Sequence, residues 1–346
     1  MTRVGFDQGG LRHANADTIR FMLTLHDATG EVHPPPADLG GAALPPGIVW
    51  IDLLAPSPDE TEFVERATGL HLPSFAELSE IETSSRLRAQ HGVLYLSAPL
   101  VHRAIADDPL TTPVGFILGP ELLVTVRFEE LTSFATFGQT VPGTASEAFV
   151  GLAEAIVDRN ADILEHIAAE LDTLSHRLFR SGPIEGGRNR RPAHEAADLR
   201  VILRRVGASG DLASKIRDGL LGIGRMVPYV ESLGAAWLPE GLKPRLETVR
   251  HDLHSLSDYD VHLVNKVQLL LDATLGLINV EQNNIIKVLT IVSVVGVPPT
   301  LVASMYGMNF KDMPELSWAW GYPSALVLIL LSAVGPLLWF RWRGWF

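Results

Sequence analysis

Two long apolar stretches constrain this chain more than any other feature of its sequence. Residues 288–305 are 18 consecutive positions without a charged side chain, and residues 318–340 are 23. Either stretch, as a helix, is long enough to cross about 30 Å of hydrocarbon. The core helix of a soluble protein can also be this apolar, but two such stretches separated by only 12 residues favour a pair of membrane spans.

The residues that flank the two stretches predict an orientation in the membrane. Lys287 precedes the first stretch, and Arg341 and Arg343 follow the second, whereas the short loop between them is acidic on balance. The positive-inside rule therefore places both termini in the cytoplasm and the loop outside, as in a protein of the cell (inner) membrane. Aromatic side chains mark both ends of the second stretch, as in interfacial belts: Trp318, Trp320, Tyr322, Trp339, Phe340, Trp342 and Trp345.

A polar stripe runs into the first stretch when that part of the chain is drawn as a helix. Its positions follow alternating steps of four and three residues, and this 3.5-residue repeat holds one seam toward the axis of a left-handed bundle. Because polar groups are costly in lipid and one chain offers only two spans, the stripe favours a ring of copies around a channel. Alternatively, its hydroxyls bond to their own helix or join neighbouring helices. The stripe comprises Asn279, Asn283, Ile286, Thr290, Ser293, Val297, Thr300 and Ser304.

Composition argues against several other classes of protein. The formal charge of −12 speaks against a nucleic-acid partner, which would require a basic surface. The chain has no cysteine, so disulfides and thiolate metal sites are excluded. The 12 histidines show no His-x3-His or His-Glu-x2-His spacing, and neither a nucleophile elbow nor an ATP-binding loop is found. The sequence therefore predicts no enzyme and no cofactor, and its first 17 residues lack the apolar core of a secretory signal.

The first part of the chain has the pattern of a soluble α/β domain. Residues 1–47 read as a tail and a Pro/Gly-rich loop with one predicted strand at 19–25, and residues 48–140 alternate short β-rich runs with helices. Ser57 and Glu60 have the spacing of a capping box. The predicted strands are 48–53, 93–96, 114–118 and 122–127, and the predicted helices are 57–69 and 74–82.

Long helical periodicity follows over residues 146–240, which we interpret as a cytoplasmic helical layer. Its helices are predicted at 149–179 and 193–233, with a Gly/Pro breaker between them. A third helix would begin near Pro244 and, if it is continuous to Tyr306, would reach about 90 Å, so most of it must project from the membrane. The expected divisions are a stalk helix at 244–306 whose first transmembrane part is about 286–306, an outer loop at 307–317, a second transmembrane helix at 318–340, and a basic-aromatic tail at 341–346.

Motifs around the loop between the spans resemble the CorA family of magnesium and cobalt transporters. Tyr306-Gly307-Met308-Asn309-Phe310 is followed by Met313-Pro314-Glu315-Leu316 and then by Trp320-Gly321-Tyr322-Pro323. A Gly-Met-Asn tripeptide alone is unspecific, but its place between two spans, with Met-Pro-Glu-Leu at this offset, is specific. Three upstream segments resemble the family in the expected order, so the resemblance covers residues 48–346: Trp50-Ile51-Asp52-Leu53, Glu80-Ile81-Glu82-Thr83-Ser84-Ser85-Arg86 and Lys287-Val288-Leu289-Thr290.

The resemblance implies an α+β membrane protein that assembles as a homopentameric channel: a cytoplasmic α/β domain, a helical layer, and a long stalk helix leading into a two-helix transmembrane hairpin. It implies Mg²⁺ as the transported ion and as a candidate regulatory ion. The selectivity loop would be Tyr306, Gly307, Met308 and Asn309, and a ring of Asn309 side chains would hold the ion through its hydration water. The pore-lining residues that it implies are Asn283, Ile286, Leu289, Val297, Thr300 and Asn309, with Asp272 as a candidate metal-facing residue at the cytoplasmic mouth.

Three further residues receive roles from their chemistry. Leu289 lies one residue off the stripe and would form a hydrophobic gate together with Ile286. Asp312 and Glu315 would raise the cation concentration outside the pore, although either is also an ordinary solvated loop charge.

One segment departs from the family pattern, and two other functions stay open. Where family members sense magnesium through acidic residues between subunits, this chain reads Val249-Arg250-His251-Asp252, so sensing would use Asp252, Asp258 or Asp260, or be weaker. The first alternative function is a ZntB-like zinc, cobalt or nickel transporter of the same family. The second is a membrane-anchored coiled-coil protein that does not conduct ions.

Overall fold

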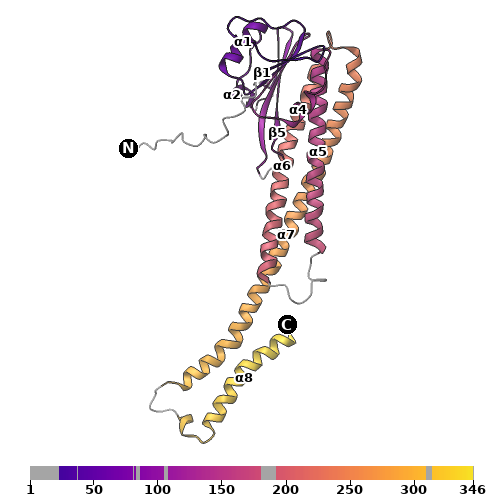
Figure 1. Cartoon of the computed structure of the whole chain (residues 1–346). Coiled ribbons are helices and arrows are strands. Elements are labelled where there is room, and N and C mark those ends of the chain that lie inside the picture. Colours follow the sequence, from indigo (N-terminus) through magenta and orange to yellow (C-terminus); the bar gives the residue numbers. More distant parts are fainter. Residues whose placement is uncertain are drawn as a thin grey trace, which may run out of the picture. The chain divides into compact units, whose positions relative to one another are not determined.

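The structure is a computed structural model that describes residues 23–36, 38–80, 82, 86–104, 108–180, 192–308 and 314–345 (Figure 1). The chain forms two compact units. The first unit holds the described residues up to Thr173 together with Gly207–Val267, and the second holds Leu174–Val206 together with the described residues from Gln268 onward.

A seven-stranded mixed sheet forms the centre of the first unit. Its spatial order is β2-β1-β3-β7-β6-β5-β4, and every neighbouring pair is antiparallel except the central pair β3 and β7. The strands are β1 (Leu23–Asp27), β2 (Val32–His33), β3 (Ile48–Leu54), β4 (Leu87–Gln90), β5 (Val93–His102), β6 (Leu110–Leu118) and β7 (Leu123–Arg127).

The predicted strands are confirmed in place but not always in length. The prediction of a strand at 19–25 corresponds to β1, and its positions 19–22 lie outside the described residues. Interpreting residues 32–33 as loop was wrong, because they pair with β1 as the edge strand β2. Strand β4 was not predicted, because it has only four residues and three of them are exposed.

The helices are α1 (Pro58–Thr68), α2 (Phe75–Leu78), α4 (Thr132–Phe137), α5 (Ala145–Arg180), α6 (Pro192–Leu233), α7 (Lys243–Tyr306) and α8 (Gly321–Trp342), with short 3₁₀ turns η1 (Glu240–Leu242) and η2 (Pro314–Ser317). The capping box at the start of α1 is confirmed: the Glu60 amide donates to Ser57 Oγ at 3.2 Å, and the Ser57 amide donates to Glu60 Oε2 at 2.8 Å. Helix α2 ends at Leu78, earlier than predicted, where the Ser79 hydroxyl donates to the Phe75 carbonyl.

The two faces of the sheet are covered by different helices. On one face, Ile51, Leu53 and Val126 pack in a cluster with Phe63 and Val64 of α1. On the other face, the Phe116 ring lies 6.2 Å from Phe134 of α4 and 6.0 Å from Phe149 of α5, and the Trp50 ring lies 5.4 Å from Phe137 of α4. The alternation of β3, in which Trp50 and Asp52 face one side and Ile51 and Leu53 the other, separates these two cores.

The parts of α5, α6 and α7 that belong to the first unit run side by side (Figure 1). Helix α6 approaches β5 closely, and a Cβ at Gly222 would lie only 2.7 Å from the Ala98 side chain. Glycine is therefore required there by space rather than by backbone conformation. The helical periodicity predicted over 149–179 is confirmed by α5, which buries its recurring apolar positions: Leu152, Ile156, Ile163, Ile167, Leu171 and Leu174.

Helix α7 buries one seam that has a heptad spacing. Its buried positions recur at intervals of three, four or seven residues, and two of them are polar: Leu246, Val249, Leu253, Asp260, Leu263, Val267, Leu270 and Thr274. Asp260 is fully buried, and its Oδ2 accepts a hydrogen bond from Arg217 Nε of α6 at 2.6 Å. The other oxygen, Oδ1, has no partner among the described residues. Burial raises the pKa of the Asp260 carboxyl, and the adjacent Arg217 opposes that rise.

The Asp260–Arg217 pair leads to different predicted stabilities for substitutions of its two members. Arg217→Met leaves a buried carboxylate without a cation and should destabilise the protein by about 3 kcal/mol at neutral pH. Asp260→Asn removes the charge itself and should stay within about 1 kcal/mol of the native chain. Thermal unfolding of the purified, detergent-solubilised protein measures both.

The pH dependence of the stability lost in Arg217→Met checks the direction of the Asp260 pKa shift. Because the folded-state pKa of Asp260 is raised, the folded chain holds the proton more tightly than the unfolded chain. The penalty is therefore full above the raised pKa and disappears as the pH falls toward the unfolded value near about 4. A defect that is equally large at pH 8 and pH 4.5 would contradict this account.

Candidate functional site

The two apolar stretches form helices that the chain itself does not bury. Helices α7 and α8 each contain an 18-residue apolar window, of which 0% and 6% respectively is buried in the described structure. The core helix of a soluble protein would be buried along such a window, so that alternative fails for these residues. Helix α8 begins at Gly321, three residues later than predicted, after a turn in which the Gly321 amide donates to the Trp318 carbonyl.

All eight residues of the predicted polar stripe lie on α7. Seven are exposed and Thr290 is partly buried. Apolar residues off the stripe are equally exposed, for example Val292 at 63% and Leu301 at 60%. Exposure in one chain therefore does not single out the stripe, and what distinguishes it is the chemistry of its side chains.

Two hydroxyls of the stripe bond to their own helix. Thr290 Oγ1 donates to the Ile286 carbonyl at 2.8 Å, and Thr300 Oγ1 donates to the Val297 carbonyl at 2.8 Å. The alternative in which stripe hydroxyls bond to their own helix is therefore correct for the hydroxyl protons of Thr290 and Thr300. Each oxygen keeps acceptor lone pairs, which are the groups that meet a cation or the water around it. Self-bonding and a cation-facing role are therefore compatible.

A double proline interrupts the hydrogen bonding of α7 at the same level. Pro298 and Pro299 lie inside the helix, which continues through them to Tyr306. Because proline has no amide proton, the carbonyls of Val294 and Val295 lose the donors that a regular helix would supply four residues later. Unpaired carbonyls are expensive in hydrocarbon but tolerable beside water or another helix. This segment therefore calls for partners that one chain does not provide.

Helix α7 ends at the start of the predicted selectivity loop. The Gly307 amide donates to the Ala303 carbonyl at 3.1 Å, the Met308 amide donates to the Met305 carbonyl at 3.3 Å, and Met308 is half exposed. Asn309 and Asp312 lie outside the described residues. Glu315 belongs to η2, where only its backbone is described. The role of the loop therefore stays a prediction.

The predicted acidic residues of α7 differ sharply in their surroundings. Asp272 is exposed, lies one heptad before Asn279 on the same series, and accepts a hydrogen bond from Gln268 Nε2 at 3.0 Å. Asp258 is exposed and lies 3.2 Å from His254, whereas Asp260 is the buried partner of Arg217. An ion from solution meets Asp258 or Asp272 before it meets Asp260.

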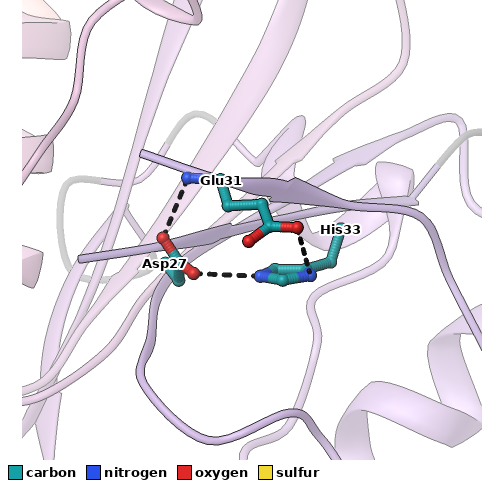
Figure 2. Close-up of side chains that lie close together, drawn as sticks. All are labelled: Asp27, Glu31 and His33. Carbon is teal, nitrogen blue, oxygen red and sulfur yellow. Dashed lines mark hydrogen bonds and ion pairs between the residues drawn. The ribbon is translucent and has the colours of Figure 1, made fainter. Parts of the chain in front are cut away.

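A cluster that the sequence did not suggest lies at the edge of the sheet. Figure 2 shows Asp27, Glu31 and His33, whose nearest ligand atoms all lie within 4.8 Å of one another. Asp27 Oδ2 lies 3.0 Å from His33 Nε2, and Glu31 Oε1 lies 4.0 Å from the opposite ring nitrogen, Nδ1. The signal in the sequence is weak, because these residues meet only after the chain turns from β1 to β2 at Gly30, which has a φ of 89°.

The contacts of Asp27 give the cluster a structural role. Its Oδ1 accepts from the Thr29 amide at 2.8 Å, the Thr29 hydroxyl at 2.7 Å and the Glu31 amide at 2.9 Å. The hydrogen bond with His33 is the largest cause that holds the pKa of the Asp27 carboxyl well below its usual range, and the bonds from Thr29 add to it. Both carboxylate oxygens are thus already used, and the imidazole separates them from Glu31, so the group is a turn clamp.

Comparison with known proteins identifies the family to which these features belong. Residues 46–342 match the family described as "CorA-like Mg2+ transporter protein". The chain is 33% identical over 303 residues to the magnesium transport protein CorA of Sodalis glossinidius, and 34% identical to that of Pectobacterium atrosepticum. Each match covers 86% of this chain and 92% of the relative.

Solved structures agree at the level of the fold. The complete CorA magnesium transporter from Methanocaldococcus jannaschii superposes with a TM-score of 0.70 at 16% identity, over 95% of this chain and 100% of that one. The full-length CmaX protein superposes with a TM-score of 0.62 at 19% identity, over 94% of this chain and 97% of that one. The similarity covers both the α/β part and the two apolar helices.

The cysteine-free sequence allows a direct test of which face of α7 meets water. Single cysteines at Ser293 and Thr300 on the stripe should react with a charged methanethiosulfonate reagent roughly tenfold or more faster than cysteines at Val292 and Leu301, because a thiol in lipid does not ionise. Labelling rates in reconstituted protein, read by mass spectrometry, give the answer. Equal rates at all four positions would show that the stripe is not the wet face.

Proposed function

Because this chain belongs to the CorA-like Mg²⁺ transporter family, we propose that it forms a magnesium-uptake channel in which five copies surround a central pore. The family is one of transporters, not of enzymes. The observation that carries the proposal for this chain is the polar stripe that runs into the apolar, unburied stretch of α7. Apart from the hydroxyl protons of Thr290 and Thr300, which bond to their own helix, the stripe and the carbonyls freed by Pro298 and Pro299 would find their partners in pore water or in other copies.

The pore would be lined by α7 from Asp272 to Ser304. Asn279 and Asn283 would contribute rings of amide oxygens on the cytoplasmic side, and Thr300 and Ser304 would contribute hydroxyl oxygens toward the outer end. Ile286 and Leu289, which are 51% and 65% exposed in the single chain, would form the hydrophobic gate between them. Asp272, held along the helix by Gln268, would attract cations at the cytoplasmic mouth.

Selection would take place at the Asn309 ring. Magnesium gives up its water reluctantly and prefers six oxygen ligands in an octahedral arrangement, so a ring of neutral amides that bonds to the hydration water suits it better than a dry carboxylate cage. The acidic residues Asp312 and Glu315 would concentrate cations in front of this ring.

No energy source beyond the membrane potential is required. An inward-negative potential of about 100 mV favours the entry of a divalent ion by about 4.6 kcal/mol, twice the value for a single charge. The protein would lie in the cell (inner) membrane with both termini in the cytoplasm. Residues 48–140 and 146–240 would then be the cytoplasmic α/β domain and helical layer, and 244–306 the stalk and first span.

Two alternative functions stay open. A zinc, cobalt or nickel transporter of the same family would use the same architecture, and the Met308 form of the loop favours magnesium over it only weakly. A non-conducting coiled-coil anchor would need neither Asn309 nor a polar stripe, so the stripe counts against it.

Asn309→Ala should abolish magnesium flux into liposomes while the oligomer stays intact, because the ring that holds the hydrated ion is lost. Asn284→Ala is the matched control: it removes the same kind of side chain, Asn284 is exposed on α7 and lies off the stripe, and its loss should leave flux unchanged. A fluorescent magnesium indicator reports flux, and native mass spectrometry reports the oligomer. Unchanged flux in the Asn309 variant would refute the selectivity assignment, and a stable monomer would refute the pore.

A panel of ions separates the two transport alternatives. Uptake of magnesium, cobalt, nickel and zinc is measured side by side, with and without a pH gradient. We expect magnesium flux that follows the membrane potential and ignores the pH gradient. Zinc flux that exceeds magnesium flux and rises with the proton gradient would establish the alternative instead.

A further inference from the structure

The end of α8 is closed by a hydrogen-bonded cap. The Gly344 amide donates to the Arg341 carbonyl at 3.2 Å, and the Trp345 amide donates to the Phe340 carbonyl at 3.1 Å. Gly344 has a φ of 72°, which is the left-handed conformation that this cap requires. Together with the Arg343 amide, which donates to the Trp339 carbonyl at 3.0 Å, these bonds satisfy carbonyls that the helix end would otherwise expose.

An aromatic contact locks the cap in place. The Trp345 ring stacks on Phe340 with centroids 5.0 Å apart and an interplanar angle of 29°. Phe340 is only 2% exposed, although nearly all of α8 is open. Such a contact between the residue after the glycine and the last turn typically accompanies this cap. Residues 339–345, which we call the 339–345 cap, are therefore an ordered structure.

Two arginines of the 339–345 cap carry charge without an acidic partner. The guanidinium of Arg343 lies 5.6 Å from the centre of the Trp339 ring, and Arg341 is exposed. Neither forms an ion pair within the part of the chain that the structure describes, and residues 316–345 contain no Asp or Glu. Trp342, between the two arginines in the chain, is 81% exposed, so an open indole accompanies the two guanidiniums at this end of α8.

This combination fits the boundary between hydrocarbon and headgroups. The 339–345 cap closes the C-terminal end of α8, a 22-residue apolar helix that is long enough to place the cap at one surface of a bilayer. Lipid phosphates lie at that level, and a guanidinium binds phosphate through two parallel hydrogen bonds. The cation–π contact with Trp339 uses the ring side of the Arg343 guanidinium and is compatible with N–H groups that bind such an acceptor.

We propose that the 339–345 cap binds the phosphate headgroup of an anionic phospholipid, with Arg343 as the principal ligand and Arg341 as a second cation. A net anionic lipid is favoured over a zwitterionic one because the two guanidiniums have no negative partner in this part of the chain. The exposed tryptophans would lie beside the glycerol region, where indole rings concentrate. The inference rests on the placement of α8 in a membrane, but it does not depend on ion conduction.

The test measures lipid retention by the purified full-length protein. After exchange into detergent with equal amounts of phosphatidylglycerol and phosphatidylcholine, native mass spectrometry counts the lipids that stay bound. Two arginines near an anionic headgroup should favour phosphatidylglycerol by about 30-fold. In R341Q/R343Q this preference should disappear. The matched control is R88Q/K243Q, which removes the same charge from the first unit and should retain the preference.

Two further arms identify what is bound. R341K/R343K keeps the charge but loses the planar fork, so its preference should fall clearly below that of the native protein. Inorganic phosphate at millimolar concentration should not displace the lipid, because the acyl chains contribute to binding. Full preference in the lysine variant would reduce the site to unspecific charge, and displacement by phosphate would make the ligand a free anion. Either result overturns the proposal.

The outcome is separable from that of the proposed function. A protein that conducts magnesium but holds no phosphatidylglycerol refutes the lipid site alone. A protein that holds phosphatidylglycerol through Arg341 and Arg343 but fails to conduct refutes the channel alone. Loss of the preference in both double variants would mean that the contact is not at α8.

Discussion

The structure depends on a change of surroundings along a single helix. Up to Thr274, α7 buries a heptad seam against its own chain, and from Leu275 to Met308 no described residue is buried. A helix can satisfy its backbone in hydrocarbon, but its polar side chains and the carbonyls freed by Pro298 and Pro299 cannot be satisfied by lipid. What one chain leaves open there has to be met by water or by other copies.

The same constraint bears on the role proposed for the stripe, which is to line a pore. Where hydroxyl protons are used inside the helix, as at Thr290 and Thr300, the groups presented outward are oxygen lone pairs. Neutral oxygens bind a hydrated cation weakly, and weak binding is what conduction requires, since an ion that enters must also leave. A stripe of carboxylates would hold Mg²⁺ more tightly and release it more slowly. Asp272, the one acid on the series, lies outside the apolar stretch.

The sequence predicted what periodicity and local chemistry control. The long helices, the buried face of α5 and the Ser57–Glu60 cap are confirmed, because each depends on residues a few positions apart. Contacts between distant residues were not predictable: Asp52 of β3 pairs with Arg127 of β7 at 2.8 Å and accepts from Thr125 Oγ1 at 2.7 Å, across more than 70 positions. Trp50 and Asp52 belong to a segment that resembles the family. Their shared contact could be seen only in the structure: the parallel pairing of β3 and β7 brings both next to Thr125, to which the Trp50 indole also donates. The hairpin contact of Asp27 with His33 was hidden because residues 32–33 read as loop.

The buried Asp260–Arg217 pair helps to fix the register of α7 against α6 within the first unit. A buried ion pair is weak support for stability, because desolvation offsets most of its attraction. It does penalise misalignment: if α7 slipped by one residue along α6, Asp260 would lie buried without its cation, which is costly. The same slip would turn every later side chain of the continuous helix by about 100°, because a helix has 3.6 residues per turn. Asn283, Thr290 and Ser304 lie on one face of α7 and would turn together by the same angle. In the proposed channel, a charge placed among apolar heptad positions would therefore help to fix the direction in which the stripe points.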